Sequence, residues 1–265
     1  MQTILVKSIK SALKQQGLQA LADKLEKIVP DLSQQYSLSE TKEGYFKTKI
    51  RAMHAFQMSL VDRVICKLGN SAVIVDIGDS AGTHIQYIKG LYSQNMSIKS
   101  LSVNIDEKAI SRIRAKGLDA VCAKAENIEN YDINPDIFLC FQTLEHLMDP
   151  CKFLRSLSSG TKAKYLIVTV PYLINSRVGL HHIRQGIQDD VYAENTHIFE
   201  LSPGDWKLLI RHSGWRIEEE KKYLQYPQNS LLKITRRFWR KNDFEGFYGF
   251  VLSRDSGWSS KYKNW

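Results

Sequence analysis

A loop rich in glycine and acidic residues follows the first strongly apolar segment of the chain. Residues 76–82 read Asp-Ile-Gly-Asp-Ser-Ala-Gly, directly after an apolar run that begins at Ala72. In open α/β sheets, ligands bind at the carboxyl ends of the strands, and the first turn is the usual place. A dinucleotide loop would have the spacing G-x-G-x-x-G and bare amides for a diphosphate, and this loop has neither. Asp76 and Asp79 favour a cationic ligand, which argues against a nicotinamide-dependent oxidoreductase.

The elements that must position this loop alternate between strand and helix. Near-continuous apolar runs predict five buried strands, at 72–77, 98–105, 118–123, 136–141 and 165–170. Helical patterns separate them, at 83–91, at 107–116 and from about Asp149. A closing pair of strands is expected at 215–224 and 244–252. This pattern predicts a doubly wound α/β fold with a mostly parallel sheet of seven strands, covered by helices on both faces.

The first seventy residues are expected to form a helical extension, with residues 71–265 as the second domain. Two apolar stripes at helical spacing, at 5–28 and 50–68, predict two helices. These helices would pack on the sheet as a lid or side wall.

A long stretch at about 172–196 lacks clear periodicity, and we expect a loop insertion there, after a strand that Pro171 ends. Loops of this length in compact domains are often functional. The stretch carries His181 and His182, two side chains that could transfer protons. A helix at 202–213 is then expected, with Ser202 as its N-cap.

The composition is that of an ordinary globular protein. Of the 265 residues, 43% are apolar and 25% are charged, and no apolar run approaches the ~18 residues of a membrane span. The start has no secretory core, so we expect a cytoplasmic protein. The net charge of +9 lies in the two flanks, because residues 71–170 are neutral. The four cysteines have no C-x-x-C spacing and are expected to be reduced core residues.

The loop at 76–82 resembles the D/E-x-G-x-G-x-G signature of class I S-adenosylmethionine-dependent methyltransferases. Three later segments agree with this family in the same order: the strand that ends before Asp106, the segment Leu-Glu-His-Leu-Met-Asp-Pro at 144–150, and the segment from His197 to Trp215. The second of these resembles the "LEHL-x-DP" segment of methyltransferases of ubiquinone biosynthesis. The resemblance covers about residues 50–254.

The resemblance implies S-adenosylmethionine as the cofactor, with S-adenosylhomocysteine as the product. The residues that it assigns to the cofactor are Asp76, Gly78, Ser80, Gly82, Asp106, Glu126 and Gln142. Ser80 replaces the middle glycine of the signature. Asp106 would bind the ribose hydroxyls, although Asp is also favoured as an ordinary helix N-cap. Lys124 stands where the family often has an acid near the adenine, and Glu126 could substitute for it.

A metal ion is not expected from this resemblance. In the ubiquinone-type branch, a motif E-x-x-E-H at this place is linked to a divalent metal. Here the first acid is Gln142, followed by Glu145 and His146, and an amide is a weaker ligand than a carboxylate for a hard cation. Glu145 and His146 could instead orient their loop.

The implied reaction is direct displacement at the sulfonium methyl, with alignment and desolvation supplied by the protein. An oxygen acceptor also needs a general base. The candidate catalytic residues are His146, His181 and His182, and the histidine pair could equally form hydrogen bonds within its own loop.

The acceptor class is indicated less directly. The basic segment Lys233–Lys241 could bind nucleic acid, an anionic membrane or a phosphorylated or lipid-linked sugar. It could also be a solvated helix face with two aromatic anchors, Phe238 and Trp239. Four aromatic residues could line an acceptor pocket or pack the sheet: Tyr223, Tyr226, Tyr248 and Trp258. We expect methyl transfer to a small molecule or glycan precursor, with an oxygen as the acceptor atom. The alternatives are an RNA or protein methyltransferase, and a non-catalytic scaffold or sensor. The sequence does not indicate an oligomeric state.

Overall fold

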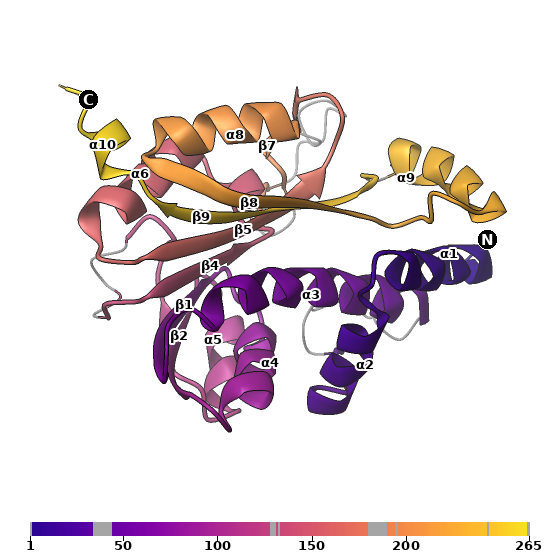
Figure 1. The fold of residues 1–265 in the computed structure, drawn as a ribbon, viewed down its shortest axis with the longest axis horizontal. Coiled ribbons are helices and arrows are strands. Elements are labelled where there is room, and N and C mark those ends of the chain that lie inside the picture. Colours follow the sequence, from indigo (N-terminus) through magenta and orange to yellow (C-terminus); the bar gives the residue numbers. More distant parts are fainter. Residues whose placement is uncertain are drawn as a thin grey trace.

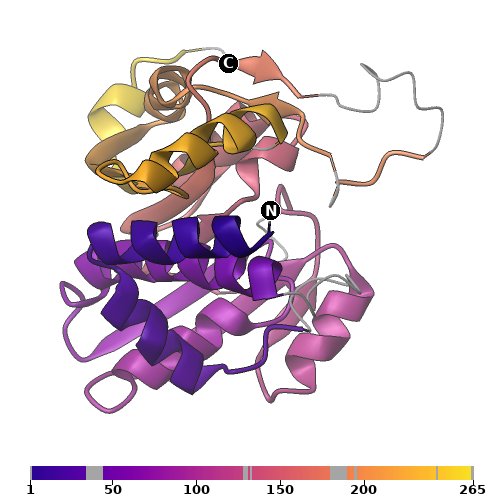
Figure 2. The same ribbon diagram turned by 90° about the vertical axis from the view of Figure 1, so that its right-hand side faces the viewer.

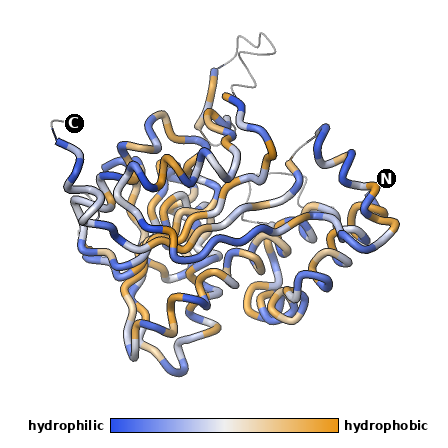
Figure 3. Tube along the Cα trace, turned by 45° about the horizontal axis from the view of Figure 1, so that its top comes forward, coloured by the Kyte–Doolittle hydropathy of each residue, from blue (hydrophilic) through white to orange (hydrophobic). Residues whose placement is uncertain are grey.

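The structure is a computed structural model, and it describes residues 2–33, 44–127, 131, 133–179, 190–193, 196–242 and 244–263 (Figure 1). A central sheet runs through the molecule, with helices on both of its faces. Apolar segments gather along the strands in the middle, and hydrophilic segments lie further out (Figure 3). Burial of apolar surface between the layers is therefore what stabilises this arrangement.

The main sheet has seven strands in the order β3-β2-β1-β4-β5-β9-β8. Its strands are β1 (Ser71–Ile77), β2 (Ser97–Asn104), β3 (Ala120–Cys122), β4 (Ile137–Phe141), β5 (Tyr165–Tyr172), β8 (Trp215–Leu224) and β9 (Gly246–Arg254). The first five strands pair in parallel, and β9 is antiparallel to both of its neighbours. The doubly wound, mostly parallel fold is thus confirmed.

Helices cover both faces of this sheet. Their bounds are α1 (Gln2–Gln15), α2 (Gln19–Ile28), α3 (Gly44–Ile65), α4 (Thr83–Tyr92), α5 (Glu107–Arg114), α6 (Pro150–Gly160), α8 (Pro203–His212), α9 (Arg236–Asn242) and α10 (Ser256–Ser259). Two 3-10 turns lie at Leu144–His146 and Leu231–Thr235. Figure 1 shows α6 and α8 on one face and α3, α4 and α5 on the other. Ser202 caps α8, as expected from the sequence.

The N-terminal extension contains three helices, not the two that the apolar stripes predicted. Gly17 adopts a φ of 71°, and this left-handed conformation ends α1 and separates it from α2. Leu5, Leu25 and Phe56 belong to the same buried cluster as Val251 of the sheet. Figure 2 shows the N-terminal helices (indigo) beside the segment that carries α9, and Ser8 Oγ lies 2.8 Å from Thr235 Oγ1 there.

Two other local expectations need correction. Strand β5 does not stop at Pro171 but continues to Tyr172, with Pro171 opposite Phe247 of β9. Pairing with β4 ends at Thr169, so no partner on that side requires an N–H from Pro171. The 172–196 stretch is also not wholly irregular, because β6 (Arg177–Val178) pairs with β7 (Phe199–Glu200).

The cysteines are free thiols, as expected, but they do not all lie in the core. Cys140 is buried, whereas Cys66 and Cys122 are exposed and Cys151 is partly buried. Within the described residues, the helices are too short or too polar for any of them to traverse a lipid bilayer.

Candidate cofactor and acceptor site

A cavity of about 1040 Å³ opens where the parallel strands of the main sheet end. Of the seven residues predicted to bind the cofactor, five line it: Gly78, Ser80, Asp106, Glu126 and Gln142. They follow four different strands, and only the parallel arrangement of those strands brings them together. The remaining two, Asp76 and Gly82, lie behind the cavity wall.

The glycines of the loop meet two separate steric requirements. Gly78 has a φ of 87°, and a Cβ atom there would lie 2.3 Å from Thr143 Oγ1. Gly82 has a φ of 72°, and its Cβ would lie 2.7 Å from Leu118 Cδ1. Gly78 is therefore needed for close approach between the first and fourth strand ends at the cavity. Gly82 is needed for the turn and its packing, and it is not among the residues that line the described part of the cavity.

Asp76 and Asp79 are both buried and are not among the residues that line the described part of the cavity, so the role in binding a cationic ligand that their charge suggested stays a prediction. The Asp76 carboxylate is buried and lies 3.0 Å from His84 Nδ1. Asp79 accepts hydrogen bonds from the amides of Ala81 and Gly82 and from Ser102 Oγ. Their charges are thus satisfied within the protein and hold the loop in shape.

The side chains of Asp76 and His84 are both buried, and each affects the pKa of the other. Burial raises the pKa of Asp76 to about 6, although His84 opposes this rise. Burial alone would lower the pKa of His84, but the carboxylate of Asp76 outweighs it and the pKa is raised overall.

A chain of hydrogen bonds extends from this pair across the sheet. His84 Nε2 lies 3.1 Å from Gln57 Oε1, and Gln57 Nε2 donates to Thr169 Oγ1 at 3.1 Å. Gln142 Nε2 donates to the same hydroxyl at 3.2 Å. Gln57 and His84 line the cavity, so α3 of the N-terminal extension forms part of the site. The sequence interpretation missed both residues.

Asp106 is both a cavity residue and a helix cap. Its carboxylate accepts from the amides of Lys108 and Ala109 at the start of α5, at 2.9 and 3.2 Å. The N-cap alternative is therefore present, and it leaves the side chain 29% exposed at the cavity. Arg112 lies 3.8 Å from this carboxylate and donates to the carbonyl oxygen of Ser80, which ties the first two loops together.

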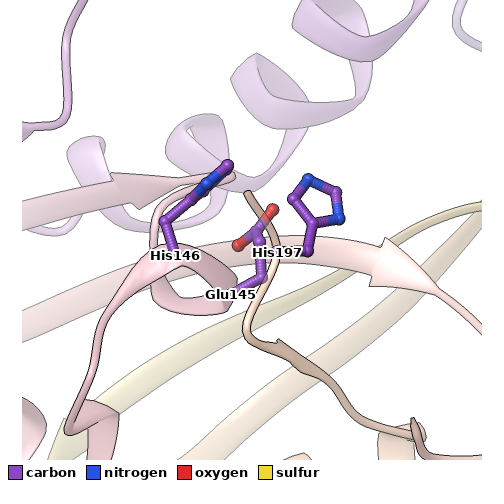
Figure 4. Close-up of side chains that lie close together, drawn as sticks. All are labelled: Glu145, His146 and His197. Carbon is purple, nitrogen blue, oxygen red and sulfur yellow. The ribbon is translucent and has the colours of Figure 1, made fainter. Parts of the chain in front are cut away.

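Three ionisable side chains meet at the other end of the cavity: Glu145, His146 and His197 (Figure 4). One ligand atom from each lies within 4.8 Å of the others, and the Glu145 carboxylate lies between the two imidazoles. The ring centroids of His146 and His197 are 4.7 Å apart. All three residues line the cavity.

Burial controls the protonation of this cluster. Burial raises the pKa of the Glu145 carboxyl to about 7, although His197 opposes the rise. Burial and the neighbouring His197 lower the pKa of His146 to about 4. Near neutral pH, Glu145 is therefore better matched to accept a proton than the predicted candidate His146.

The other two candidate bases, His181 and His182, lie outside the described residues. His197 was not predicted as a site residue, although the sequence segment that begins with it was noticed. Only the resemblance of that segment to the family could have pointed to His197, because Glu145 and His197 are far apart in sequence and are brought together by the fold.

Aromatic and cationic side chains surround the acceptor end. Phe46, Phe244 and Phe247 line the cavity, and Lys49 Nζ lies 5.0 Å from the Phe244 ring centroid. The ring centroids of His197 and Phe244 are 6.4 Å apart.

The four aromatic residues that the sequence offered as an acceptor pocket lie elsewhere in the structure. Tyr223 and Tyr226 are buried in the core, and Tyr248 stacks on Tyr172, with ring centroids 6.0 Å apart. Trp258 lies in α10, beside Tyr262. None of the four is among the residues that line the described part of the cavity.

Two of the five basic residues of the segment Lys233–Lys241 form ion pairs within the fold. Arg236 and Arg240 both pair with the buried carboxylate of Glu245. Trp239 is fully buried and stacks on Tyr45 of α3. The helix that carries this segment is thus anchored to α3 by Trp239, and binding of an acceptor by its basic residues stays a prediction.

Comparisons with known proteins place this fold. The chain matches no family model and no curated protein. The solved [4+2]-cyclase SpnF shares the fold with a TM-score of 0.58 at 12% identity, over 92% of this chain and 97% of that one. A SAM-dependent methyltransferase from Leishmania major gives 0.53 at 13% identity, over 89% and 82% of the two chains. A SAM-dependent methyltransferase from Mesorhizobium loti gives a TM-score of 0.51 at 12% identity, over 74% of this chain and 96% of that one.

At these identities the likeness concerns the fold. The strand order with one antiparallel strand near the edge, the loop after β1 and the cavity at the strand ends all agree with it. The chain has the fold of class I S-adenosylmethionine-dependent methyltransferases.

Proposed function

We propose that this protein transfers a methyl group from S-adenosylmethionine to an oxygen atom of a small molecule or glycan precursor. The observation that carries the proposal is the convergence of five predicted cofactor residues on one cavity, with an ionisable cluster at its other end. A volume of about 1040 Å³ has room for a nucleoside cofactor together with a small acceptor.

The residues at the β1–β2 side would hold the cofactor. Asp106 presents an exposed carboxylate edge that suits ribose hydroxyls, and Gly78 keeps the wall bare of side-chain atoms. Glu126 and Lys124 both line the cavity beyond Asp106, and Glu126 would face the adenine amino group. The bound cofactor supplies an activated methyl group, so the protein mainly needs to align the acceptor.

The cluster side would hold the acceptor. The Glu145 carboxylate would take the proton from an acceptor hydroxyl, because its raised pKa of about 7 suits a base at neutral pH. His146 donates from Nδ1 to the carbonyl oxygen of Thr196 and would orient the acceptor through Nε2. The partly buried Phe244 offers a ring on which a sugar can pack, and Lys49 beside it would contact an attached phosphate.

A methyl-transfer screen tests this proposal. The protein is incubated with methyl-labelled S-adenosylmethionine and either nucleotide-sugars and oligosaccharides or RNA. We expect label in a sugar acceptor, and Lys49→Met should raise its KM at least tenfold if the acceptor carries phosphate. Label in RNA alone would contradict the acceptor class.

A second function is favoured by one comparison. SpnF, a [4+2]-cyclase, has this fold over 92% of the chain, so the same cavity can serve a reaction other than methyl transfer. Production of S-adenosylhomocysteine distinguishes the two, because only methyl transfer consumes the cofactor. Binding of the cofactor without its turnover, over the full acceptor screen, would favour the scaffold or sensor alternative.

A further inference from the structure

We propose that the exposed face of residues 231–241, with α1 beside it, binds to the surface of an anionic lipid bilayer. These residues form the 3-10 turn Leu231–Thr235 and α9, in the connection between β8 and β9 at one end of the molecule (Figure 1). Leu231 is 96% exposed and Ile234 is 69% exposed. Two large aliphatic side chains held in water so close together indicate a surface for interaction.

The exposed side chains of this segment lie along one face. Leu231 and Ile234 are three positions apart in the 3-10 turn, a spacing that places side chains in line. Arg237 and Lys241 follow three and seven positions after Ile234, on the same face of the helix that continues the turn. All four are exposed, whereas Trp239 is fully buried. The docking surface consists of these four exposed residues and the exposed Lys233.

Helix α1 lies beside the docking surface and adds positive charge (Figure 2). Ser8 Oγ of α1 lies 2.8 Å from Thr235 Oγ1 of the 3-10 turn. Residues 1–22 contain three lysines, all exposed, and no acidic residue. Residues 223–242 contain five basic residues and no acidic one. The fold thus brings together two basic segments that carry no carboxylate side chains of their own.

Most of the charge on the docking surface is available to a partner. Two arginines of α9 pair with the buried carboxylate of Glu245. In contrast, Lys233, Arg237 and Lys241 form no ion pair with a carboxylate in the described part of the chain. Exposed basic side chains near a bilayer are attracted to acidic lipid headgroups.

The mixture of side chains favours lipid over nucleic acid. Proteins that bind single-stranded nucleic acid combine basic grooves with aromatic rings on which bases stack. The one tryptophan of this segment, Trp239, is fully buried and offers no such ring. Phosphates would give Leu231 and Ile234 no contact that removes them from water, whereas the boundary between headgroups and acyl chains would. Binding to a membrane surface strengthens with buried apolar area and with attraction to anionic lipids, and the docking surface supplies both.

The docking surface is connected to the acceptor end of the cavity. Lys49 Nζ lies 5.8 Å from the ring centroid of Trp239 in α9 and 5.0 Å from that of Phe244, which lines the cavity. A chain bound to lipid through α9 would therefore hold this end of the cavity near the headgroups. Any effect on the acceptor rests on the proposed methyl transfer, whereas binding to lipid does not.

The test is co-sedimentation of the purified protein with lipid vesicles. Vesicles of phosphatidylcholine alone are compared with vesicles of phosphatidylcholine and phosphatidylglycerol in equal parts. We expect binding to the anionic vesicles only, weakened by added sodium chloride. The double variant Leu231→Ser, Ile234→Ser should bind about tenfold more weakly, because the aliphatic side chains no longer leave water. The double variant Arg237→Gln, Lys241→Gln should bind about twentyfold more weakly, at roughly fivefold for each lost cation.

Two matched substitutions elsewhere serve as controls. Leu208→Ser removes a leucine of α8 that is 62% exposed, and Lys152→Gln removes an exposed lysine of α6. Both helices lie on the other face of the sheet from α3, and both variants should bind the anionic vesicles as wild type does (Figure 1). Circular dichroism verifies that every variant is folded.

Three results would overturn the inference. The first is the absence of binding to anionic vesicles by folded wild-type protein. The second is binding that the double serine variant leaves unchanged, since this would reduce the attraction to the net charge of +9 alone. The third is tighter binding to single-stranded RNA than to the vesicles, with the double glutamine variant losing it and the double serine variant retaining it. S-adenosylmethionine binding is measured on the same samples without vesicles, so the inference and the proposed function can fail separately.

Discussion

At the scale of single residues, the cofactor loop depends on the absence of one Cβ atom. Gly78 and Thr143 belong to loops after β1 and β4, and these loops touch at the point where the cavity opens. Thr143 Oγ1 donates to the carbonyl oxygen of Ile77, directly beside Gly78. The sequence showed the glycine, but it could not show which side chain requires it, because that contact joins distant segments.

Gly78→Ala is therefore expected to destabilise the protein by about 1–3 kcal/mol, through the positive φ and the clash with Thr143. Thr143→Ala removes the clashing atoms, so the double variant should recover at least about 0.5 kcal/mol relative to additivity. Urea unfolding of the two single variants and the double variant measures this coupling. Strict additivity would show that the two loops do not meet as described.

Asp106 combines two roles that substitution can separate. Asp106→Ala removes the cap of α5 and should cost about 1 kcal/mol of unfolding free energy. Asp106→Ser retains a capping oxygen but shortens the side chain, so it should lower the unfolding free energy by only a few tenths of a kcal/mol. Equal stability of the two variants in urea unfolding would contradict the capping role.

At the scale of elements, a buried polar chain joins helices and strands around the site. It links α3 to β1, α4, β4 and β5 through Asp76, His84, Gln57, Thr169 and Gln142. The sequence predicted the seven strands of the main sheet and the helix caps at Ser202 and Asp106, since these follow local patterns. It did not predict that α3 would contribute to the cavity, because that contact depends on tertiary packing.

The Asp76–His84 pair predicts a pH dependence of stability. Both pKa values are raised in the folded state, so the native protein binds more protons than the unfolded chain, first between the ordinary pKa of Asp76 and about pH 6, and then between the ordinary and the raised pKa of His84. Stability from this pair therefore falls as pH rises through these windows, by up to about 1.4 kcal/mol per pH unit for each proton. In Asp76→Asn, burial lowers the pKa of His84 with only the more weakly coupled Asp79 to oppose it, so the contribution of His84 should no longer fall with pH in this way.

The measurement is the unfolding free energy of wild type and Asp76→Asn between pH 5 and 8 in urea. The difference, wild type minus variant, should decrease as pH increases. A difference that is constant with pH would show that the pair does not share protons as described.

At the scale of the whole molecule, the N-terminal helices and the sheet share one core. Leu25 of α2 is fully buried and belongs to the same cluster as Ile74 of β1 and Val251 of β9. We therefore predict that the chain unfolds in a single calorimetric transition. Leu25→Ala should lower the midpoint temperature of that whole transition. A cost of about 2–5 kcal/mol is expected for this cavity. Two transitions, of which Leu25→Ala moves only one, would show that residues 1–70 unfold as a separate unit.

The two halves of the cavity differ in how far the sequence could predict them. The half that we propose for the cofactor follows local signals at Gly78, directly after β1, and at Asp106, just beyond the end of β2. The acceptor half depends on Glu145 and His197, which the chain brings together over a long separation. Sequence reasoning noticed Glu145 and His146 because both belong to one local motif, although it named only His146 as a candidate base. It did not identify the imidazole of His197, which comes from a distant segment.

The central claim, that the cavity binds S-adenosylmethionine, is tested most directly by calorimetric titration with S-adenosylmethionine and S-adenosylhomocysteine. We predict one site per chain with micromolar affinity for wild type. Asp106→Ser, which retains the helix cap, should bind at least tenfold more weakly because the carboxylate edge is lost. No heat of binding with a folded wild-type protein, or equal affinity of wild type and Asp106→Ser, would contradict the assignment of the cofactor site.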